Sequence, residues 1–342
     1  MRLGYAFVKL WVRTGLFCYY RRVRIHGHEQ VPKDRALLFL SNHQNALMDV
    51  LLLATSCGRD PWFLARADIF QNAFGSLFKS LHMIPIYRIR DGKQNLAKNN
   101  AIFDQCGALL KKGEAILIFP EANHSLNRRI RPLSKGFTRI AFNALETDAD
   151  LDIVLVPVGQ NYRHPTQVGD SAALHFGTPI AVPNTPEPKS AKVLTERATQ
   201  ALRELTVHIP EERDYEAALA QIETQGWDVL QPQQVNAALA KNGTAQRAKK
   251  TDSSPSPKPA KWLFDLINLP WVLLWRLLVR PLVPEPEFKA TFRFVFALLA
   301  YPIGYGAALL LLSQSYSLEL GLIVLAGHVS ANLFLVKVVG LT

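Results

Sequence analysis

The C-terminal end of the chain contains two long apolar stretches, and they limit the possible folds more than any other feature. Phe292–Ser313 and Leu318–Val339 each reach the roughly 20 apolar residues that a helix needs to cross a bilayer. Only Gln314–Ser317 separate them, so we expect a two-helix transmembrane hairpin. The rest of the chain must then fold beside a membrane surface.

Basic residues lie on one side of this hairpin. The turn between the stretches has no Lys or Arg, and Lys337 lies near the end of the second stretch. Three more cations, Arg276, Arg280 and Lys289, precede the first stretch, and Arg293 lies at its start. Because Lys and Arg are enriched in cytoplasmic loops, we expect an inner, cytoplasmic-membrane protein whose main domain faces the cytoplasm.

The composition limits the kinds of binding partner and the redox compartment that we expect for this chain. The 342 residues carry a net charge of +11, which favours anionic partners such as acidic lipid headgroups, phosphorylated substrates or nucleic acid. The 3 cysteines are widely spaced, which argues against a disulfide framework and suits a reducing compartment.

Residues 26–230 alternate between strand-like and helix-like segments. Apolar, β-rich runs occur at Ala36–Leu40, Trp62–Ala65, Ile84–Tyr87, Ala115–Phe119 and Ile153–Val158. Helix-like stretches lie between them, at Ile69–Leu81, Gln94–Lys112 and Ser134–Leu145. This alternation predicts an α/β domain with a mostly parallel sheet flanked by helices, followed by the C-terminal two-helix transmembrane hairpin.

The segments around this domain differ in composition. Residues 1–25 mix aromatic and basic side chains, which indicates a helix at the membrane interface or, alternatively, an ordinary N-terminal core helix. Residues 231–260 are rich in Pro, Ser and Lys and are expected to form a solvated linker. We expect residues 261–290, with three tryptophans, to lie in the interface, and residues 291–342 to form the hairpin.

The first polar block places a histidine and an aspartate where a strand gives way to a helix. His43 and Asp49 follow the run that ends at Leu40, and Asn42 or Asn45 is suited to cap the helix. An imidazole can take a proton near neutral pH, and a carboxylate can orient it and stabilise the imidazolium. The pair is therefore a candidate catalytic base, or alternatively a structural polar contact.

Two further polar blocks each follow a strand-like run. In the second block, Ile84–Gly92, Arg88 follows the strand-like run and is suited to bind a phosphate or, alternatively, to form a solvated Arg–Asp cluster at the turn. In the third block, Glu121 could accept a substrate hydroxyl or hold a basic residue in place. The remaining candidate binding residues follow it: Asn123, His124, Ser125, Arg128 and Lys135. A fourth block around Pro157 and Gly159 is expected to shape a wall.

In this order the blocks resemble the glycerolipid acyltransferase family, which includes 1-acyl-glycerol-3-phosphate acyltransferases. The resemblance covers Leu37 to Asn161 and rests on the Asn-His…Asp block, the Arg-bearing block, Phe119-Pro120-Glu121 and the Val-Pro block. It implies that His43 is the general base and Asp49 its orienting carboxylate. It also implies that Arg88 and Glu121 help to bind the glycerol phosphate portion of the acceptor.

Two positions depart from the family pattern. Five residues separate His43 from Asp49 instead of the usual four, so the intervening turn must bulge or the carboxylate must reach farther. The third block has Ala122 where Gly is usual and His124 where Arg is usual, which leaves the neighbouring arginines as substitutes for the lost charge.

The resemblance implies a fatty acyl transfer from acyl-CoA or acyl carrier protein to the hydroxyl of a lysophospholipid, most simply 1-acyl-glycerol-3-phosphate. Glycerol-3-phosphate or another lysolipid is the alternative acceptor. No cofactor, metal or nucleic acid is expected, and the partners are membrane lipids, the acceptor and the thioester donor. A membrane-tethered basic adaptor would explain the charge and the spans but not the ordered blocks. A zinc site lacks paired ligands at suitable spacing.

Overall fold

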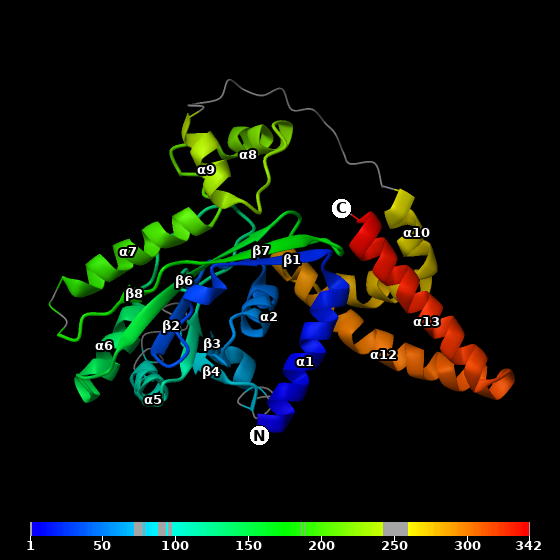
Figure 1. Ribbon diagram of the computed structural model, residues 1–342, viewed down its shortest axis with the longest axis horizontal. Coiled ribbons are helices and arrows are strands. Elements are labelled where there is room, and N and C mark those ends of the chain that lie inside the picture. The colour runs from blue at the N-terminus through cyan, green and yellow to red at the C-terminus, as the bar shows by residue number, and fades with distance from the viewer. Residues whose placement is uncertain are drawn as a thin grey trace.

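The computed structural model describes residues 2–71, 78, 80–87, 94, 98–185, 187, 189–241 and 259–341 (Figure 1). Across these residues runs a sheet with the strand order β1-β7-β6-β2-β5-β3-β4, and β8 also pairs with β6. The strands are β1 Arg22–His26, β2 Ala36–Ser41, β3 Trp62–Arg66, β4 Met83–Ile86, β5 Ala115–Ile118, β6 Ile153–Tyr162, β7 Ser171–Phe176 and β8 Ile180–Ala181.

Most neighbouring strands are parallel, and this confirms the predicted fold class. β2 pairs in parallel with both β5 and β6, and β3 pairs in parallel with β4 and β5. Antiparallel pairing occurs where β6 meets β7 and β8. Pro157 of β6 lies between the register of β8 and that of β7, where its missing N–H removes no bond from either ladder.

Alternating side chains of β2 supply two separate cores. Leu37 and Phe39 pack in one cluster with residues of α1 (Arg2–Tyr19), α2 (Ala46–Ser56) and α12 (Lys289–Ser315). Leu38 and Leu40 pack in the other, against α5 (Asn99–Lys111), α6 (Gly136–Thr147) and α7 (Ser190–Leu205). Since successive strand residues point to opposite faces, every residue of β2 is buried. The strand that leads to the first polar block is therefore fixed on both faces.

The N-terminal helix is shorter than expected. α1 ends at Tyr19, and Arg22–His26 form β1, a strand at the edge of the sheet parallel to β7. The alternation of Arg22, Val23, Arg24 and Ile25 is a strand pattern, so assigning residues 1–25 to one helix was wrong. Charged side chains are typical of exposed edge strands.

The expected linker is also partly wrong. Pro232–Lys241 form α9, which buries Val235 and Leu239 against residues of α8 (Tyr215–Thr224). This short apolar pattern was hidden by the flanking polar composition. The remainder of the predicted linker, residues 242–258, lies outside the described residues.

The C-terminal segments form the expected helical hairpin. Pro286–Ser315 and Leu318–Val339 are long and apolar enough to cross a membrane, and α13 (Leu318–Phe334) packs against α12. Before them, α10 (Pro259–Ile267) and the helical stretch that starts with α11 (Leu269–Leu274) meet at 90°, as in a broken span or a re-entrant loop. In Figure 1, α1 lies between the sheet and α12.

Candidate active site

The polar blocks meet at one edge of the sheet because β2, β5 and β6 run in parallel there. The carboxyl ends of parallel strands are the usual position of a ligand site in such sheets. The backbone N–H of Ser125, after β5, donates to the carbonyl of His43, after β2, at 3.0 Å. Gln44 extends its side-chain amide to the carbonyl of Leu126 at 2.8 Å. The first and third blocks are thus joined directly.

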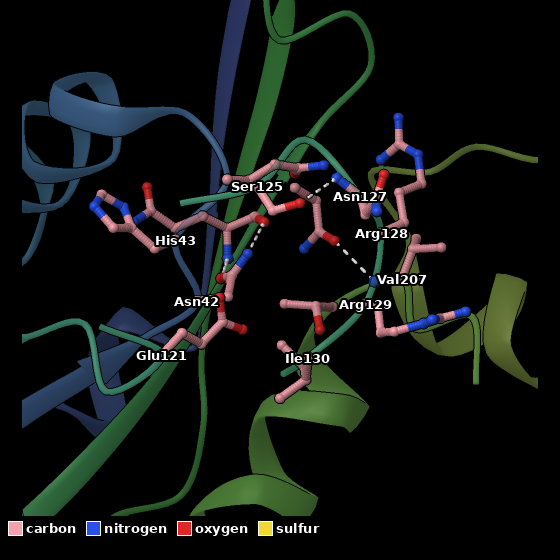
Figure 2. A pocket seen from close by; sticks show the side chains of 13 residues that line it. Asn42, His43, Glu121, Ser125, Asn127, Arg128, Arg129, Ile130 and Val207 are labelled. Carbon is pink, nitrogen blue, oxygen red and sulfur yellow. Dashed lines mark hydrogen bonds between the residues drawn. The ribbon is translucent and has the colours of Figure 1, made fainter. Parts of the chain in front are cut away.

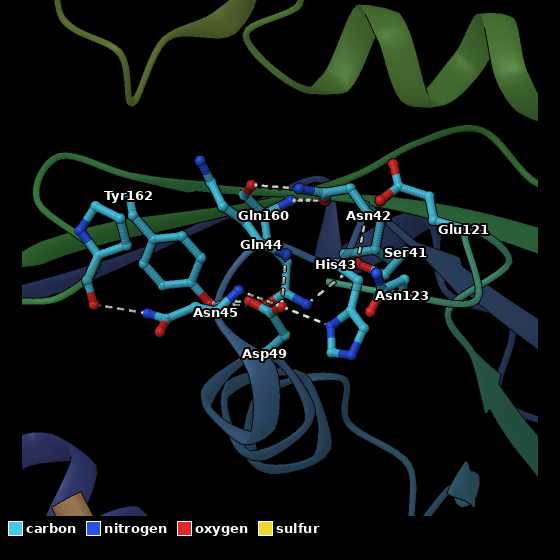
Figure 3. Close-up of polar contacts among 12 residues, drawn as sticks. Ser41, Asn42, His43, Gln44, Asn45, Asp49, Glu121, Asn123, Gln160 and Tyr162 are labelled. Carbon is cyan, nitrogen blue, oxygen red and sulfur yellow. Dashed lines mark hydrogen bonds and ion pairs between the residues drawn. The ribbon is translucent and has the colours of Figure 1, made fainter. Parts of the chain in front are cut away.

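His43 and Asp49 are in contact. The Nδ1 of His43 lies 2.8 Å from the Oδ2 of Asp49. The aspartate side chain is 0% exposed, whereas that of the histidine is 17% exposed. The pair therefore has the geometry of a base held by a carboxylate, with the base alone reaching the surface (Figure 3).

Three further donors point at the carboxylate of Asp49. Its Oδ2 accepts the backbone N–H groups of Gln44 at 2.8 Å and Asn45 at 2.7 Å. Its Oδ1 accepts the hydroxyl of Tyr162 at 2.6 Å. Burial raises the pKa of Tyr162 well above its ordinary value, and Asp49 raises it further, so the phenol keeps its proton and donates. Charge-assisted bonds of this kind stabilise a buried carboxylate.

The turn between His43 and Asp49 absorbs the extra residue by bulging. Ala46 adopts a φ of 44°, a left-handed conformation that is uncommon for a residue with a Cβ. Asn45 occupies the N-cap of α2 without capping it; its side chain donates instead to the carbonyl of Pro165 at 2.9 Å. Asp49, in the first turn of α2, accepts the backbone N–H groups of the two residues before the helix, Gln44 and Asn45, and this holds the turn. The longer spacing thus preserves the contact.

The other imidazole nitrogen of His43 is open. Nε2 makes no hydrogen bond to any part of the chain that the structure describes. The ring stacks on Phe119 with centroids 4.1 Å apart, and the ring of His124 lies edge-on at 5.7 Å. These contacts fix the plane of the ring and leave Nε2 as the atom that can meet an incoming hydroxyl.

Glu121 holds a basic residue in place. It accepts from the backbone N–H of Arg131 at 3.2 Å and from the guanidinium at 2.6 Å, and its side chain is 2% exposed. Burial raises the pKa of Glu121 from its ordinary value, while Arg131 and the backbone N–H of His43 lower it. Of the two roles the sequence allowed for this carboxylate, the structure favours the one that organises the loop.

The neighbouring arginines also bond to the chain itself. Arg128 donates to the carbonyls of Tyr162 at 2.8 Å and Arg163 at 3.2 Å, and Arg129 donates to those of Ile209 and Pro210. The burial of Arg128 lowers the pKa of its guanidinium. The expectation that these two arginines replace the missing charge of the third block is therefore not supported by their positions.

The other predicted binding residues are placed as follows. Asn123 is exposed and its carbonyl accepts from Arg131. His124 pairs with Glu285, which comes from the segment before the hairpin, at 2.9 Å. Lys135 is exposed at the start of α6. Arg88 lies outside the described residues.

His124, Glu285 and Glu287 also bring ligand atoms within 4.8 Å of one another. Two of these residues are exposed or partly exposed carboxylates at the short 3-10 helix Pro286–Phe288, and exposed acidic groups gather without a metal in many proteins. We assign no metal to them.

Sequence reasoning missed two residues from β6 that complete the site. Tyr162 bonds to Asp49, and Gln160 exchanges two bonds with the Asn42 amide, at 2.9 and 2.7 Å. Both lie in a continuous buried strand, and their polarity in such a strand was the available signal. A small polar pocket adjoins this side of the site, lined in part by Asn42, Ser125 and Gln160 (Figure 2).

The site lies within a segment that matches a known family. Residues 22–160 match the family model described as Acyltransferase. Over 155 residues the chain is 30% identical to the "Probable 1-acyl-sn-glycerol-3-phosphate acyltransferase" of Mycoplasma pneumoniae, covering 43% of this chain and 56% of that protein. It is 29% identical over 107 residues to "Glycerol-3-phosphate O-acyltransferase 1" of Saccharomyces cerevisiae, covering 29% of this chain and 14% of that protein.

A solved structure is also similar. The 1-acyl-sn-glycerophosphate acyltransferase of Thermotoga maritima is 18% identical with a TM-score of 0.39, over 56% of this chain and 74% of that one. The chain spans little more than half the length of the bacterial curated relative. The family model and the bacterial relative, independently of this structure, confirm the resemblance seen in the sequence for residues 22–160.

Proposed function

We propose that this chain, whose residues 22–160 belong to the acyltransferase family, transfers a fatty acyl group from a thioester to the hydroxyl of a lysophospholipid. The observation that carries the proposal is the His43–Asp49 pair with an open Nε2 at the carboxyl edge of the sheet. The similarity to the probable 1-acyl-sn-glycerol-3-phosphate acyltransferase of Mycoplasma pneumoniae supports 1-acyl-glycerol-3-phosphate as the acceptor. The yeast relative favours glycerol-3-phosphate as the alternative.

In the proposed reaction the acceptor oxygen attacks the carbonyl carbon of the thioester. His43 Nε2 removes the hydroxyl proton as the C–O bond forms, and the C–S bond then breaks. The imidazolium gives this proton to the departing thiolate, so the base is regenerated. Asp49 orients the ring and stabilises its transient charge. A proton transfer of this kind contributes about 10²–10⁴-fold to the rate.

The partly open surroundings of His43 fit an acceptor that is bound at a membrane. The phosphate of such an acceptor needs a cation near His43. Among the described candidates for this role, Lys135 is exposed. The other candidate, Arg88, lies outside the described residues. We propose that these two residues, with His124, meet the polar end of the acceptor. We also propose that the domain faces the cytoplasm at the cytoplasmic membrane, anchored by α12 and α13.

The test is a transfer assay with the purified full chain in lipid nanodiscs. Labelled acyl-CoA and acyl carrier protein are each offered with 1-acyl-glycerol-3-phosphate, glycerol-3-phosphate and a zwitterionic lysolipid. We expect transfer to the first acceptor and a loss of at least about 10²-fold in His43→Ala. The matched control is His26→Ala, an exposed histidine on β1. Full turnover in the His43→Ala protein would refute the proposal.

A further inference from the structure

A second cavity lies outside the residues that match the family. Its volume is about 830 Å³, and it is a partly open space lined by residues of α1, α10, α11 and the hairpin. Apolar side chains form most of its wall, including Trp271, Phe294, Ala297 and Val329. This volume is within the usual range for a site that takes a small organic ligand. The cavity is therefore large enough for part of a lipid.

The lining of this cavity also includes several cations with few acids to balance them. Lys261 and Arg276 both face Asp265, at 2.9 and 3.8 Å. Arg280 and Lys289 line the same cavity and pair with no carboxylate among the residues that the structure describes. An unbalanced positive charge beside an apolar chamber matches a ligand with an anionic head and an apolar tail.

A fifth cation of the lining, Arg293, is on the side of the cavity that contacts the loop next to the site. Its guanidinium donates to the carbonyl of Thr166 at 3.2 Å and lies 5.0 Å from the ring centroid of Trp275. The next carbonyl along the chain toward the site, that of Pro165, accepts the side chain of Asn45. Because the backbone N–H of Asn45 bonds to Asp49, a short chain of contacts joins the cavity wall to the catalytic pair.

The helices that line the cavity are locally irregular. Trp275–Val279 and Leu335–Val339 are both π-helical turns, and each contributes lining residues: Trp275 and Arg276 from the first, Val336 from the second. Single π turns within helices are frequent at functional sites. Their presence on two walls is a separate indication that this space binds something.

We propose that the cavity binds an anionic glycerophospholipid, with one acyl chain in the apolar chamber and the phosphate against Arg280, Lys289 and Arg293. The site is built by the C-terminal helices rather than by the acyltransferase segment. That its occupant is the acceptor or the product of acyl transfer rests on the proposed function. The binding of an anionic lipid is independent of the proposed function, because it requires only the cations and the apolar cavity.

The experiment uses the full chain in detergent and a 1-acyl-glycerol-3-phosphate whose acyl chain carries a photoactivatable group. After irradiation, labelled peptides are identified by mass spectrometry. We expect labels on the lining residues of α11 and α12, competed by phosphatidic acid but not by diacylglycerol or inorganic phosphate. Competition by inorganic phosphate at similar concentrations would show that the cations bind free phosphate instead, and would overturn the lipid assignment.

Two pairs of variants test the phosphate site and the acyl-chain site of the cavity separately. Arg280→Gln with Lys289→Gln should lower labelling about tenfold through the lost charge-assisted bonds, whereas Arg13→Gln, an exposed arginine on α1, should not. Ala297→Trp should fill the chamber and abolish labelling, whereas Leu299→Trp, on the exposed face of the same helix, should leave it unchanged. Equal labelling in each variant and its control would contradict the proposal.

The labelling is repeated in His43→Ala to keep the two proposals distinguishable. We expect cavity labelling to persist in that protein although transfer is lost. If labelling is retained in all proteins but no acceptor is ever acylated, the proposed function fails and the lipid site remains. If transfer proceeds but labels are spread evenly over the outer faces of α12 and α13, the lipid site fails and the proposed function remains.

Discussion

The His43 site and the loop after β5 adjoin each other, and each presents polar side chains after a strand, but they use them differently. At His43 one ring nitrogen is bound by Asp49 and the other is open. In the loop, Glu121 and Arg131 bond to each other, and Arg128 donates to the carbonyl of Tyr162 in β6. The comparison teaches that residue type alone does not identify a ligand site, because what matters is whether a polar atom remains unused.

The same criterion separates two groups of cations. The arginines of the loop carry enough charge for a phosphate, yet their donors satisfy carbonyls and a buried carboxylate. Arg280 and Lys289 lie far away in the sequence and pair with no acid in the described part of the chain. A distant segment thus offers better placed charge for an anionic lipid than the block that resembles the family most closely.

The largest effect in this comparison is expected from Asp49→Asn. An amide cannot accept from the imidazole and from three other donors in the same way, and it does not stabilise an imidazolium. We expect transfer to fall about 10³–10⁴-fold, measured as initial rates. Asp34→Asn, an exposed aspartate, is the control. A loss below about fivefold would mean that the carboxylate only fills space.

A smaller effect is expected from Glu121→Gln. The variant removes a buried, charge-assisted pair with Arg131, so we expect the free energy of unfolding to fall by about 1–3 kcal/mol, measured by thermal or chemical unfolding. The rate should fall only as far as the loop shifts His43, by about tenfold. Arg131→Gln should reproduce both changes.

This result would distinguish a scaffold from a ligand site. A rise in KM for the acceptor without any loss of stability would instead make Glu121 a substrate ligand. That outcome would show that the loop side chains bind substrate even though they also bond to the protein, and the difference between them and His43 Nε2 would no longer hold.

The smallest effect is expected from Tyr162→Phe. The change removes one of four bonds to Asp49 and keeps the ring in the core, so the unfolding free energy should fall by about 1–2 kcal/mol. Transfer should fall several-fold at most, because His43 keeps its contact. Tyr316→Phe, which alters an exposed tyrosine, serves as the control. A loss as large as that of Asp49→Asn would give the phenol a direct part in the reaction.

The sequence predicted the sheet, the hairpin and the contact between His43 and Asp49 in outline. Long apolar runs and polar residues at strand ends are local signals, and they placed β2, α12 and α13 correctly. It did not predict β1, because an edge strand with alternating arginines is too polar to register as part of a core.

The remaining misses depend on contacts distant in sequence. Tyr162 reaches Asp49 across 113 positions, and Glu285 reaches His124 across 161. No local pattern records such pairs. The hydrogen bonds from Arg128 to the carbonyls of Tyr162 and Arg163 could not be predicted for the same reason.

The central claim is that His43 and Asp49 act as one unit on the acceptor hydroxyl. A double-mutant cycle on kcat/KM with His43→Ala, Asp49→Asn and the combined variant tests it directly. The account predicts that Asp49→Asn costs nothing further once His43 is absent, so that the combined variant retains the residual rate of His43→Ala. Fully additive losses, or wild-type turnover in His43→Ala, would contradict it.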